Sequence, residues 1–401
     1  MPSEPDGQTI MLNTSLSPWP CFTQEEADAV SKVLLSNKVN YWTGNECREF
    51  EKEFAAFAGT QYAVALANGT LALDAALKAI GIGAGDDVIV TSRTFLASAS
   101  CIVNAGANPV FADVDLNSQN ISAETVKAVL TPNTKAVIVV HLAGMPAEMD
   151  GIMALAKEHN LWVIEDCAQA HGAKYKGKSV GSIGHVGAWS FCQDKIMTTG
   201  GEGGMVTTND KELWSKMWSY KDHGKSYDAV YHREHAPGFR WLHESFGTNW
   251  RMMEMQAVIG RIQLKRMPEW TARRQENAAK LAESLGKFAS IRLVEVADYI
   301  GHAQYKFYAF VKPEHLKDGW TRNRIVNELN ARKVPCYQGS CSEVYLEKAF
   351  DNTPWRPKER LKNAVELGDT GLMFLVHPTL TDDEIAFCKE HIEAVLAEAT
   401  Q

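Results

Sequence analysis

The chain alternates short apolar runs with longer segments in which apolar residues recur every three or four positions. Spacing of that kind predicts amphipathic helices, and continuous apolar runs between turn residues predict strands buried on both faces. The predicted strands are residues 62–67, 87–91, 109–115, 134–142 and 161–166, with helices between them at segments such as 71–80 and 149–159. Alternating strands and helices predict an α/β fold with a mostly parallel sheet flanked by helices.

The pattern changes after residue 266. Long helical patterns at 253–266 and 271–285 are followed by predicted strands at 291–296, 304–311 and 333–337 and by helices at 322–329 and 381–399. This mixture is typical of an α+β domain. We therefore expect a large domain over residues 1–266, including the N-terminal segment, and a smaller C-terminal domain over residues 267–401.

Polar residues follow several of the predicted strands. Asn68-Gly69-Thr70 follows the first strand and opens a helix, Phe95 follows the second, and Asp166 ends the strand 161–166. In parallel sheets, ligands bind at the carboxyl ends of the strands. The Asn-Gly-Thr turn can bind a phosphate at the helix N-terminus or can simply cap the helix.

Lys195 lies in a polar turn between two apolar runs, with Ser190 before it and Gly200, Gly201, Gly203 and Gly204 after it. We expect the turn to lie between two buried strands, with the glycines allowing tight backbone folding. A desolvated lysine amine can form a covalent bond with a carbonyl compound or with pyridoxal phosphate. A solvated loop lysine is the alternative for this residue taken alone.

Pyridoxal phosphate needs a lysine anchor, an anion beside its pyridine nitrogen, a phosphate cup and an aromatic ring against its face. The sequence offers Lys195 as the anchor and Asp166 as the anion. Gly69 and Thr70 with Ser190 are the candidate phosphate cup, and Phe95 is the candidate aromatic ring.

Together these motifs resemble the DegT/StrS sugar aminotransferases of the aspartate-aminotransferase superfamily. The matching stretches run in family order over most of the chain: 68–73, 94–95, 111–115, 141–144, 165–172, 190–204, 247–251 and 256–264. The resemblance implies the fold type I architecture with a seven-stranded-type sheet, pyridoxal 5'-phosphate as cofactor and L-glutamate as amino donor. It also implies a homodimer with shared active sites.

The resemblance assigns further residue roles. It implies that Gln169 lies near the phenolic oxygen of the cofactor and that Asn249 reaches the cofactor phosphate of the neighbouring subunit. Lys195 would act as general base and acid for the proton shift. His171 also matches a family position, where we expect it to hydrogen-bond Asp166 and fix it.

Three other functions are alternatives to an aminotransferase. A related sugar dehydratase would carry histidine where Lys195 stands, and a non-catalytic regulator would be favoured by loss of Lys195 or Asp166. A nicotinamide-dependent enzyme would need Gly-x-Gly-x-x-Gly after the first strand, which is absent. Transamination is therefore favoured.

The sugar acceptor is less determined. Residues 334–343 depart from the Tyr-x-Pro-x-His-type pattern of many nucleotide-sugar members, which favours an unusual or acidic sugar such as 8-oxo-3,8-dideoxy-octulosonate, a precursor of a lipopolysaccharide sugar. A nucleotide-linked 3- or 4-keto sugar is the alternative. Lys306, His302 and Arg240 are candidates for binding an acidic substrate, with a role as surface charges as the alternative.

Composition excludes several other classes. The net charge of -8 over 401 residues argues against nucleic acid or an anionic membrane as main partner, and no apolar run reaches bilayer length. The eight scattered cysteines suit reduced thiols, so we expect a cytoplasmic protein. A histidine-rich stretch at 223–243 has no compact ligand spacing, which favours a surface or subunit-contact loop over a metal site.

Overall fold

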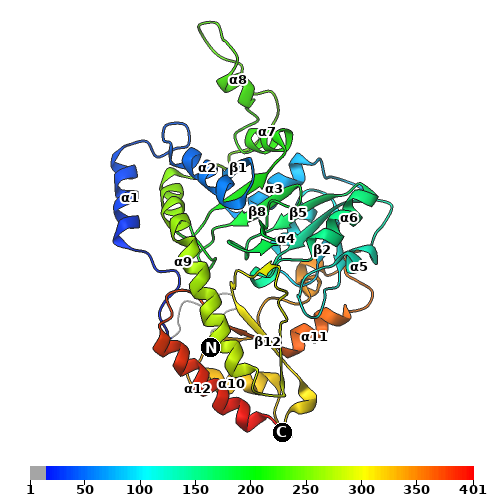
Figure 1. Ribbon diagram of the computed structural model, residues 1–401. Coiled ribbons are helices and arrows are strands. Elements are labelled where there is room, and N and C mark those ends of the chain that lie inside the picture. Colours follow the sequence, from blue (N-terminus) through cyan, green and yellow to red (C-terminus); the bar gives the residue numbers. More distant parts are fainter. Residues whose placement is uncertain (1–14) are drawn as a thin grey trace.

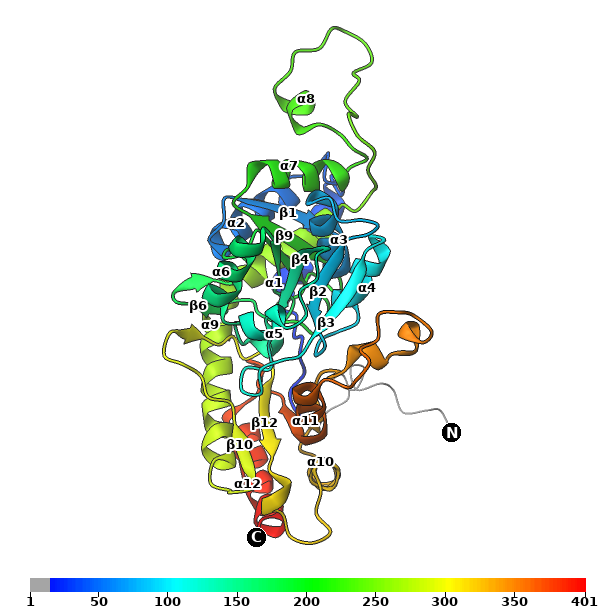
Figure 2. The ribbon, with the colours of Figure 1, turned by 90° about the vertical axis from the view of Figure 1, so that its right-hand side faces the viewer.

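The computed structural model describes residues 15–401 and shows an α/β part joined to a smaller sheet-and-helix part (Figures 1 and 2). The long helix α9 (Glu254–Leu285) runs along both parts. A loop carrying the short helix α8 (Tyr227–Tyr231) projects away from the α/β part, at the top of both views.

A seven-stranded sheet with the order β1-β9-β8-β5-β4-β2-β3 forms the centre of the α/β part. Its strands are β1 (Tyr62–Leu66), β2 (Asp87–Thr91), β3 (Asn108–Ala112), β4 (Thr134–Val140), β5 (Trp162–Asp166), β8 (Val186–Ser190) and β9 (Gly204–Thr208). Only β9 runs antiparallel to its neighbours, so the predicted mostly parallel sheet is confirmed. β8 and β9 enclose the Lys195 turn, as the sequence predicted.

Both faces of the sheet are buried. Val88 and Val90 of β2 belong to one apolar core, and Ile89 between them belongs to a second core on the opposite face. The first core packs under α3 (Gly69–Ala79) and α4 (Ala97–Asn104), and the second under α5 (Ala123–Lys127) and α6 (Met149–His159). This arrangement explains why the strands are apolar at successive positions, because each side chain packs against a helix layer on one face of the sheet or the other.

The C-terminal part is built on a four-stranded antiparallel sheet with the order β10-β12-β14-β13. Its strands are β10 (Ile291–Leu293), β12 (Phe307–Val311), β13 (Cys336–Tyr337) and β14 (Gly371–Phe374), and its helices are α10 (Arg322–Ala331), α11 (Lys362–Thr370) and α12 (Asp382–Ala399). The sequence did not predict α11 or β14, because four apolar residues directly after a polar helix give no clear strand pattern.

The remaining elements are α1 (Gln24–Leu35), α2 (Glu46–Ala58), α7 (Lys211–Tyr220) and the short strands β6 (Lys174–Tyr175), β7 (Lys178–Ser179) and β11 (Ile300–Gly301), which form a small three-stranded sheet. No helix within residues 15–401 is long and apolar enough to cross a membrane.

The two helices predicted at 253–266 and 271–285 are one helix, so that prediction was wrong. Pro268 lies inside α9, where it removes one backbone hydrogen bond at a cost of about 3 kcal/mol. Burial of Leu264 and Met267 on the core-facing side offsets that cost. The proposed boundary at 266/267 falls within α9, and residues 16–19 contact the C-terminal part. The division into two domains stays a proposal.

Candidate active site

A cavity of about 610 Å³ opens at the carboxyl ends of the central strands. One wall, here called the sheet wall, comes from the α/β part. The facing C-terminal wall is made by Tyr305, Lys306, Tyr308, Gly339, Ser340 and Met373. Seven of the residues predicted for the site lie on the sheet wall: Gly69, Thr70, Phe95, Asp166, Gln169, Ser190 and Lys195. The structure therefore brings together residues that are up to 126 positions apart in the sequence, from Gly69 to Lys195.

The turn before α3 lies directly against the end of β8. A Cβ atom on Gly69 would lie 2.5 Å from the Ser190 Cβ, and one on Gly204 would lie 2.2 Å from the Asn68 carbonyl oxygen. Only glycine permits these approaches. Asn68 caps α3 by accepting the Leu71 amide at 3.0 Å. The amides of Gly69 and Thr70 stand at the start of the helix beside the Ser190 hydroxyl, where the helix dipole favours an anion.

Lys195 lies within the turn that connects β8 and β9. Its side chain is only 19% exposed, and its Nζ lies 3.2 Å from Asp194 Oδ1 and 5.5 Å from the centre of the Tyr305 ring. Tyr305 in turn donates its hydroxyl to Asp194. Burial alone would raise the pKa of Asp194, but the ammonium groups of Lys195 and Lys306 hold it below its ordinary value.

Asp166 ends β5 and faces the cavity with a buried carboxylate. Ser98 Oγ donates to Oδ2 at 2.7 Å, and the Ala168 amide donates to Oδ1 at 3.1 Å. Burial raises the pKa of Asp166, with these hydrogen bonds acting in the opposite direction. Because the surroundings penalise the anion, a cation placed beside Asp166 would stabilise it.

The role predicted for His171 is wrong. Asp166 is held by Ser98 on α4, whereas the His171 ring packs between Trp189 and Phe191 with neither nitrogen hydrogen-bonded to Asp166. Burial lowers the pKa of His171 to about 3, so the ring is neutral. Ser98 was missed because a serine at the second position of a helix has no distinctive sequence signal.

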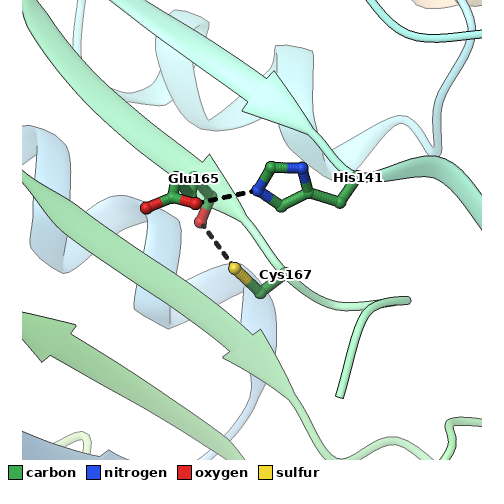
Figure 3. A group of neighbouring side chains, drawn as sticks. All are labelled: His141, Glu165 and Cys167. Atoms are coloured by element: carbon green, nitrogen blue, oxygen red, sulfur yellow. Dashed lines mark hydrogen bonds and ion pairs between the residues drawn. The ribbon is translucent and has the colours of Figure 1, made fainter. Parts of the chain in front are cut away.

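His141, Glu165 and Cys167 lie close together behind the sheet wall (Figure 3). The group has metal-ligand side chains, but the imidazole and carboxylate lone pairs are already in use. His141 Nδ1 accepts the Ala147 amide, so Nε2 carries the hydrogen and donates to Glu165 Oε2 at 2.9 Å. Backbone amides of residues 181, 183 and 184 also donate to the Glu165 carboxylate. The group therefore fixes the end of β5 beside Asp166.

The electrostatics of Glu165 agree with that structural role. Burial raises the pKa of a carboxyl group, but the hydrogen bonds from His141 and the amides of Gly181 and Gly184 outweigh it, and the pKa lies below the ordinary value. Cys167 Sγ contacts the Glu165 carbonyl oxygen at 3.6 Å. A buried, ionised and fully hydrogen-bonded carboxylate anchors the loop 181–184 to the strand that carries Asp166.

Gln169 and Phe95 both present side chains to the cavity. The Gln169 Oε1 accepts the Ala143 amide at 2.8 Å, so its amide NH₂ is left as a donor. Phe95 is 51% exposed, which leaves its ring face accessible. Asn249 does not line the cavity. It is an exposed residue paired by backbone with Asp222, at the base of the projecting loop.

The C-terminal wall contains residues that the sequence analysis did not assign to the site, or for which a surface role was the alternative. Lys306 lines the cavity and is 7% exposed. Burial lowers its pKa to about 7, with Arg274 and Lys195 adding to the effect and Asp194 opposing it. His302 lies instead at a separate cavity between β11 and α9, and Arg240 is exposed on the projecting loop. Of the three candidates for an acidic substrate, only Lys306 reaches the site.

The described part of the chain, residues 15–401, contains eight cysteines, all as free thiols. The histidine-rich stretch lies largely on the projecting loop, where His235 hydrogen-bonds the Ala229 carbonyl. Both observations agree with the sequence reading of reduced thiols and a surface loop.

Comparison with known proteins identifies the family of this chain. Residues 20–393 match the model of the DegT/DnrJ/EryC1/StrS aminotransferase family. The chain belongs to that family. The resemblance inferred from the motifs is therefore confirmed, and the protein is a pyridoxal phosphate-dependent sugar aminotransferase of polysaccharide biosynthesis.

Individual relatives cover almost the whole chain. The spore coat polysaccharide biosynthesis protein SpsC of Bacillus subtilis is 36% identical over 94% of this chain and 95% of its own. GDP-perosamine synthase of Escherichia coli O157:H7 is 33% identical over 93% and 96%. The X-ray structure of an aminotransferase from Psychrobacter cryohalolentis is 64% identical, covers 95% of this chain and 99% of that chain, and has a TM-score of 0.94.

The residues of the sheet wall fit pyridoxal phosphate. The α3 amides with Ser190 form a cradle that a Cβ on Gly69 would fill, which suits a phosphate. The buried Asp166 carboxylate suits a pyridinium, and the NH₂ group of Gln169 suits a phenolate oxygen. The Lys195 amine shares the cavity with all three.

Proposed function

We propose that this aminotransferase moves the amino group of L-glutamate to the carbonyl carbon of a sugar, with Lys195 as covalent anchor and proton carrier. One observation carries the proposal. The Lys195 amine, the Asp166 carboxylate and the α3 amide end beside Ser190 line a single cavity. Each supplies one of the interactions that pyridoxal phosphate requires.

The bound cofactor supplies an electron sink that stabilises negative charge at the carbon losing its proton. With the cofactor bound, the Lys195 Nζ would act as general base and then general acid for that proton. Asp166, held in place by Ser98, would offer its carboxylate to the pyridine nitrogen. Gly69, Thr70 and Ser190 would hold the phosphate. Phe95 would offer its ring and Gln169 its NH₂ group to the cofactor ring.

The C-terminal wall supports an acidic sugar as acceptor. Lys306 adds a second amine to the cavity, and Asp194 faces both Lys195 and Lys306. A substrate carboxylate would bind a protonated Lys306 favourably in this dehydrated setting. We therefore propose a carboxylate-bearing keto or aldehyde sugar, with 8-oxo-3,8-dideoxy-octulosonate as the specific candidate, giving the 8-amino sugar.

A nucleotide-linked 3- or 4-keto sugar is the second candidate. The name of a relative, GDP-perosamine synthase, favours it, because that protein's product is nucleotide-linked. In this case the nucleotide would extend beyond the cavity.

We also propose that the enzyme works as a homodimer with shared sites. Asn249 pairs by backbone with Asp222 and is not among the residues that line this subunit's own cavity. The projecting loop exposes Phe239, Trp241 and Phe246, which are 76%, 83% and 100% exposed. Burial of these side chains against a second copy would bring Asn249 toward that copy's phosphate cradle.

An acceptor screen with the purified enzyme tests the proposal. The enzyme is incubated with L-glutamate and either 8-oxo-3,8-dideoxy-octulosonate or nucleotide-linked 4-keto sugars, and products are identified by mass spectrometry. We expect amination of the acidic octulosonate together with release of 2-oxoglutarate. Amination of the nucleotide-linked sugars alone would contradict the acidic acceptor and support the second candidate. Failure to convert glutamate at all would contradict the donor.

A further inference from the structure

Trp19 reaches the main chain of Lys195 from the N-terminal end of the protein. Its side chain is 5% exposed, and its Nε1 donates a hydrogen bond to the Lys195 carbonyl oxygen at 2.8 Å. The two residues are 176 positions apart. No sequence pattern connects them, because Trp19 precedes the first helix and lies outside every motif of the site.

This hydrogen bond acts on the backbone that carries the Lys195 side chain. The Lys195 amide donates to the Cys192 carbonyl at 3.1 Å, so the peptide before the residue is held inside the turn. Trp19 holds the peptide after it. With both flanking peptides fixed, the Cα–Cβ bond of Lys195 has a defined direction, and the side chain starts its path into the cavity from a fixed point.

Trp19 is itself held by the C-terminal part. Its ring meets Trp270 of α9 edge-on with centres 5.0 Å apart, stacks on His377 at 6.1 Å and lies 4.9 Å from the Arg274 guanidinium carbon. The neighbouring backbone is anchored to the same part of the molecule. The Ser17 amide donates to Glu384 Oε1 at 2.6 Å, and Thr379 Oγ1 donates to the Pro18 carbonyl at 2.7 Å.

Arg274 ties this contact back to the cavity. It is buried, and it donates to the carbonyl of Tyr305, the residue whose hydroxyl bonds Asp194 next to Lys195. The Lys195 turn is thus linked to the C-terminal part on two sides. One link runs through Trp19 to the Lys195 carbonyl, and the other runs through Tyr305 to Asp194.

We propose that Trp19 is a positioning residue for Lys195. Its indole N–H orients the peptide that follows the lysine, and its ring fixes the lysine turn to α9 and to the segment around His377. The inference rests on the proposed role of Lys195 as anchor. It adds that the amine is directed toward the cofactor by the N-terminal segment and by the C-terminal part, in addition to its own turn.

Trp19→Phe tests this inference, since it keeps an aromatic ring against Trp270 and His377 and removes only the indole N–H. The matched control is Trp214→Phe. The Trp214 Nε1 also donates to a main-chain carbonyl, that of Ala63, at 3.3 Å, and Trp214 lies outside the cavity. Both variants are prepared with bound cofactor and compared with the wild type.

Two readouts separate positioning from packing. The first is the pH titration of the absorbance band of lysine-bound pyridoxal phosphate, and the second is the single-turnover rate with L-glutamate. For Trp19→Phe we expect a displaced titration midpoint and a rate about tenfold lower, with an unchanged KM for glutamate. For Trp214→Phe we expect neither change. The melting temperature of each apo-protein is measured alongside.

The outcomes are distinguishable. An unchanged titration and rate in Trp19→Phe would overturn the inference, and so would equal losses in both variants or a loss explained by a lower melting temperature of Trp19→Phe. Failure of the proposed function is seen separately in the wild type, which would then show no lysine-bound band.

Discussion

The two walls of the cavity are built in different ways. The predicted residues of the sheet wall lie in segments that follow strand ends or open a helix, with Lys195 in the turn between β8 and β9, and the parallel sheet brings these segments to one edge. The C-terminal wall is made by Tyr305 and Lys306 before β12, by Tyr308 of β12, by Gly339 and Ser340 after β13, and by Met373 of β14. The first wall offers the groups that the cofactor requires, whereas the second offers a cation and hydroxyl groups. This difference suggests that the common chemistry of the family resides in the sheet wall and the choice of sugar in the C-terminal wall.

Replacing Lys195 is expected to have the largest effect. Lys195→Ala removes both the covalent anchor and the proton carrier, so kcat should fall by more than about 10³-fold. The absorbance band of lysine-bound cofactor should disappear. Lys216→Ala is the control, since Lys216 forms a surface ion pair with Glu212. A variant without Lys195 that keeps its band and more than a tenth of its activity would contradict the account.

Asp166→Asn should have the next largest effect. The amide has nearly the same shape but no charge, so kcat for the glutamate half-reaction should fall by about 10²-fold. Ser98→Ala removes one hydrogen bond to the carboxylate and should reduce the same rate by about tenfold or less. Stopped-flow absorbance measures both. An equal loss in the two variants would mean that Ser98 has a role beyond holding Asp166.

A substitution on the C-terminal wall should affect the sugar acceptor and the glutamate donor differently. Lys306→Met removes the buried cation, so the KM for an acidic sugar should rise by about tenfold or more, while the glutamate half-reaction should change little. Lys216→Met, which removes a cation from a surface ion pair with Glu212, should leave both unchanged. A rise of the glutamate KM in Lys306→Met as large as that for the sugar would assign Lys306 to the donor.

The pH dependence of acceptor binding tests the role of Lys306 in the wild-type enzyme, without a substitution. Burial lowers the Lys306 pKa to about 7, so the side chain is positively charged below that pH and neutral above it. Binding of an anionic acceptor should therefore weaken as the pH rises through 7, seen as a rising KM. Lys306→Met should show no such inflection. The same inflection in Lys306→Met would place its origin in another group.

Asn249→Ala should have the smallest effect, because Asn249 is expected to contribute one hydrogen bond across the subunit contact. Pyridoxal phosphate should dissociate about fivefold more readily. Mixing inactive Lys195→Ala with Asn249→Ala subunits would produce dimers in which one site has both native residues. Faster cofactor release from Asn249→Ala alone, reversed in these mixed dimers, would indicate shared sites. Release unchanged by mixing would contradict sharing.

The sheet wall was predictable because local patterns determine it. Strand ends and the glycines around Lys195 are visible in the sequence, and parallel strands bring their ends to one edge. Ser98 was not predictable, since its contact with Asp166 depends on how α4 packs on the sheet. The error at His171 has the same origin, because sequence proximity suggested a contact with Asp166 that the buried ring does not make.

The C-terminal wall illustrates why the rest could not be predicted. Lys306 resembles a surface lysine in the sequence, and it lines the cavity only because β12 lies next to β14, a strand that the pattern did not reveal. Pro268 predicts a helix end locally, but tertiary packing on both sides keeps α9 continuous. Trp19 donates a hydrogen bond to the main-chain carbonyl of Lys195. A contact with the backbone does not depend on the type of the accepting residue, so residue patterns do not predict it.

The most direct measurement is the site of covalent attachment. The holoenzyme is reduced with borohydride, which makes the lysine–cofactor link permanent, and is then digested and analysed by mass spectrometry. We predict a single pyridoxyl group on the peptide that contains Lys195, and none on the peptide that contains Lys306, the other amine lining the cavity. A pyridoxyl group on Lys306 in place of Lys195, or on neither lysine, would contradict the central claim.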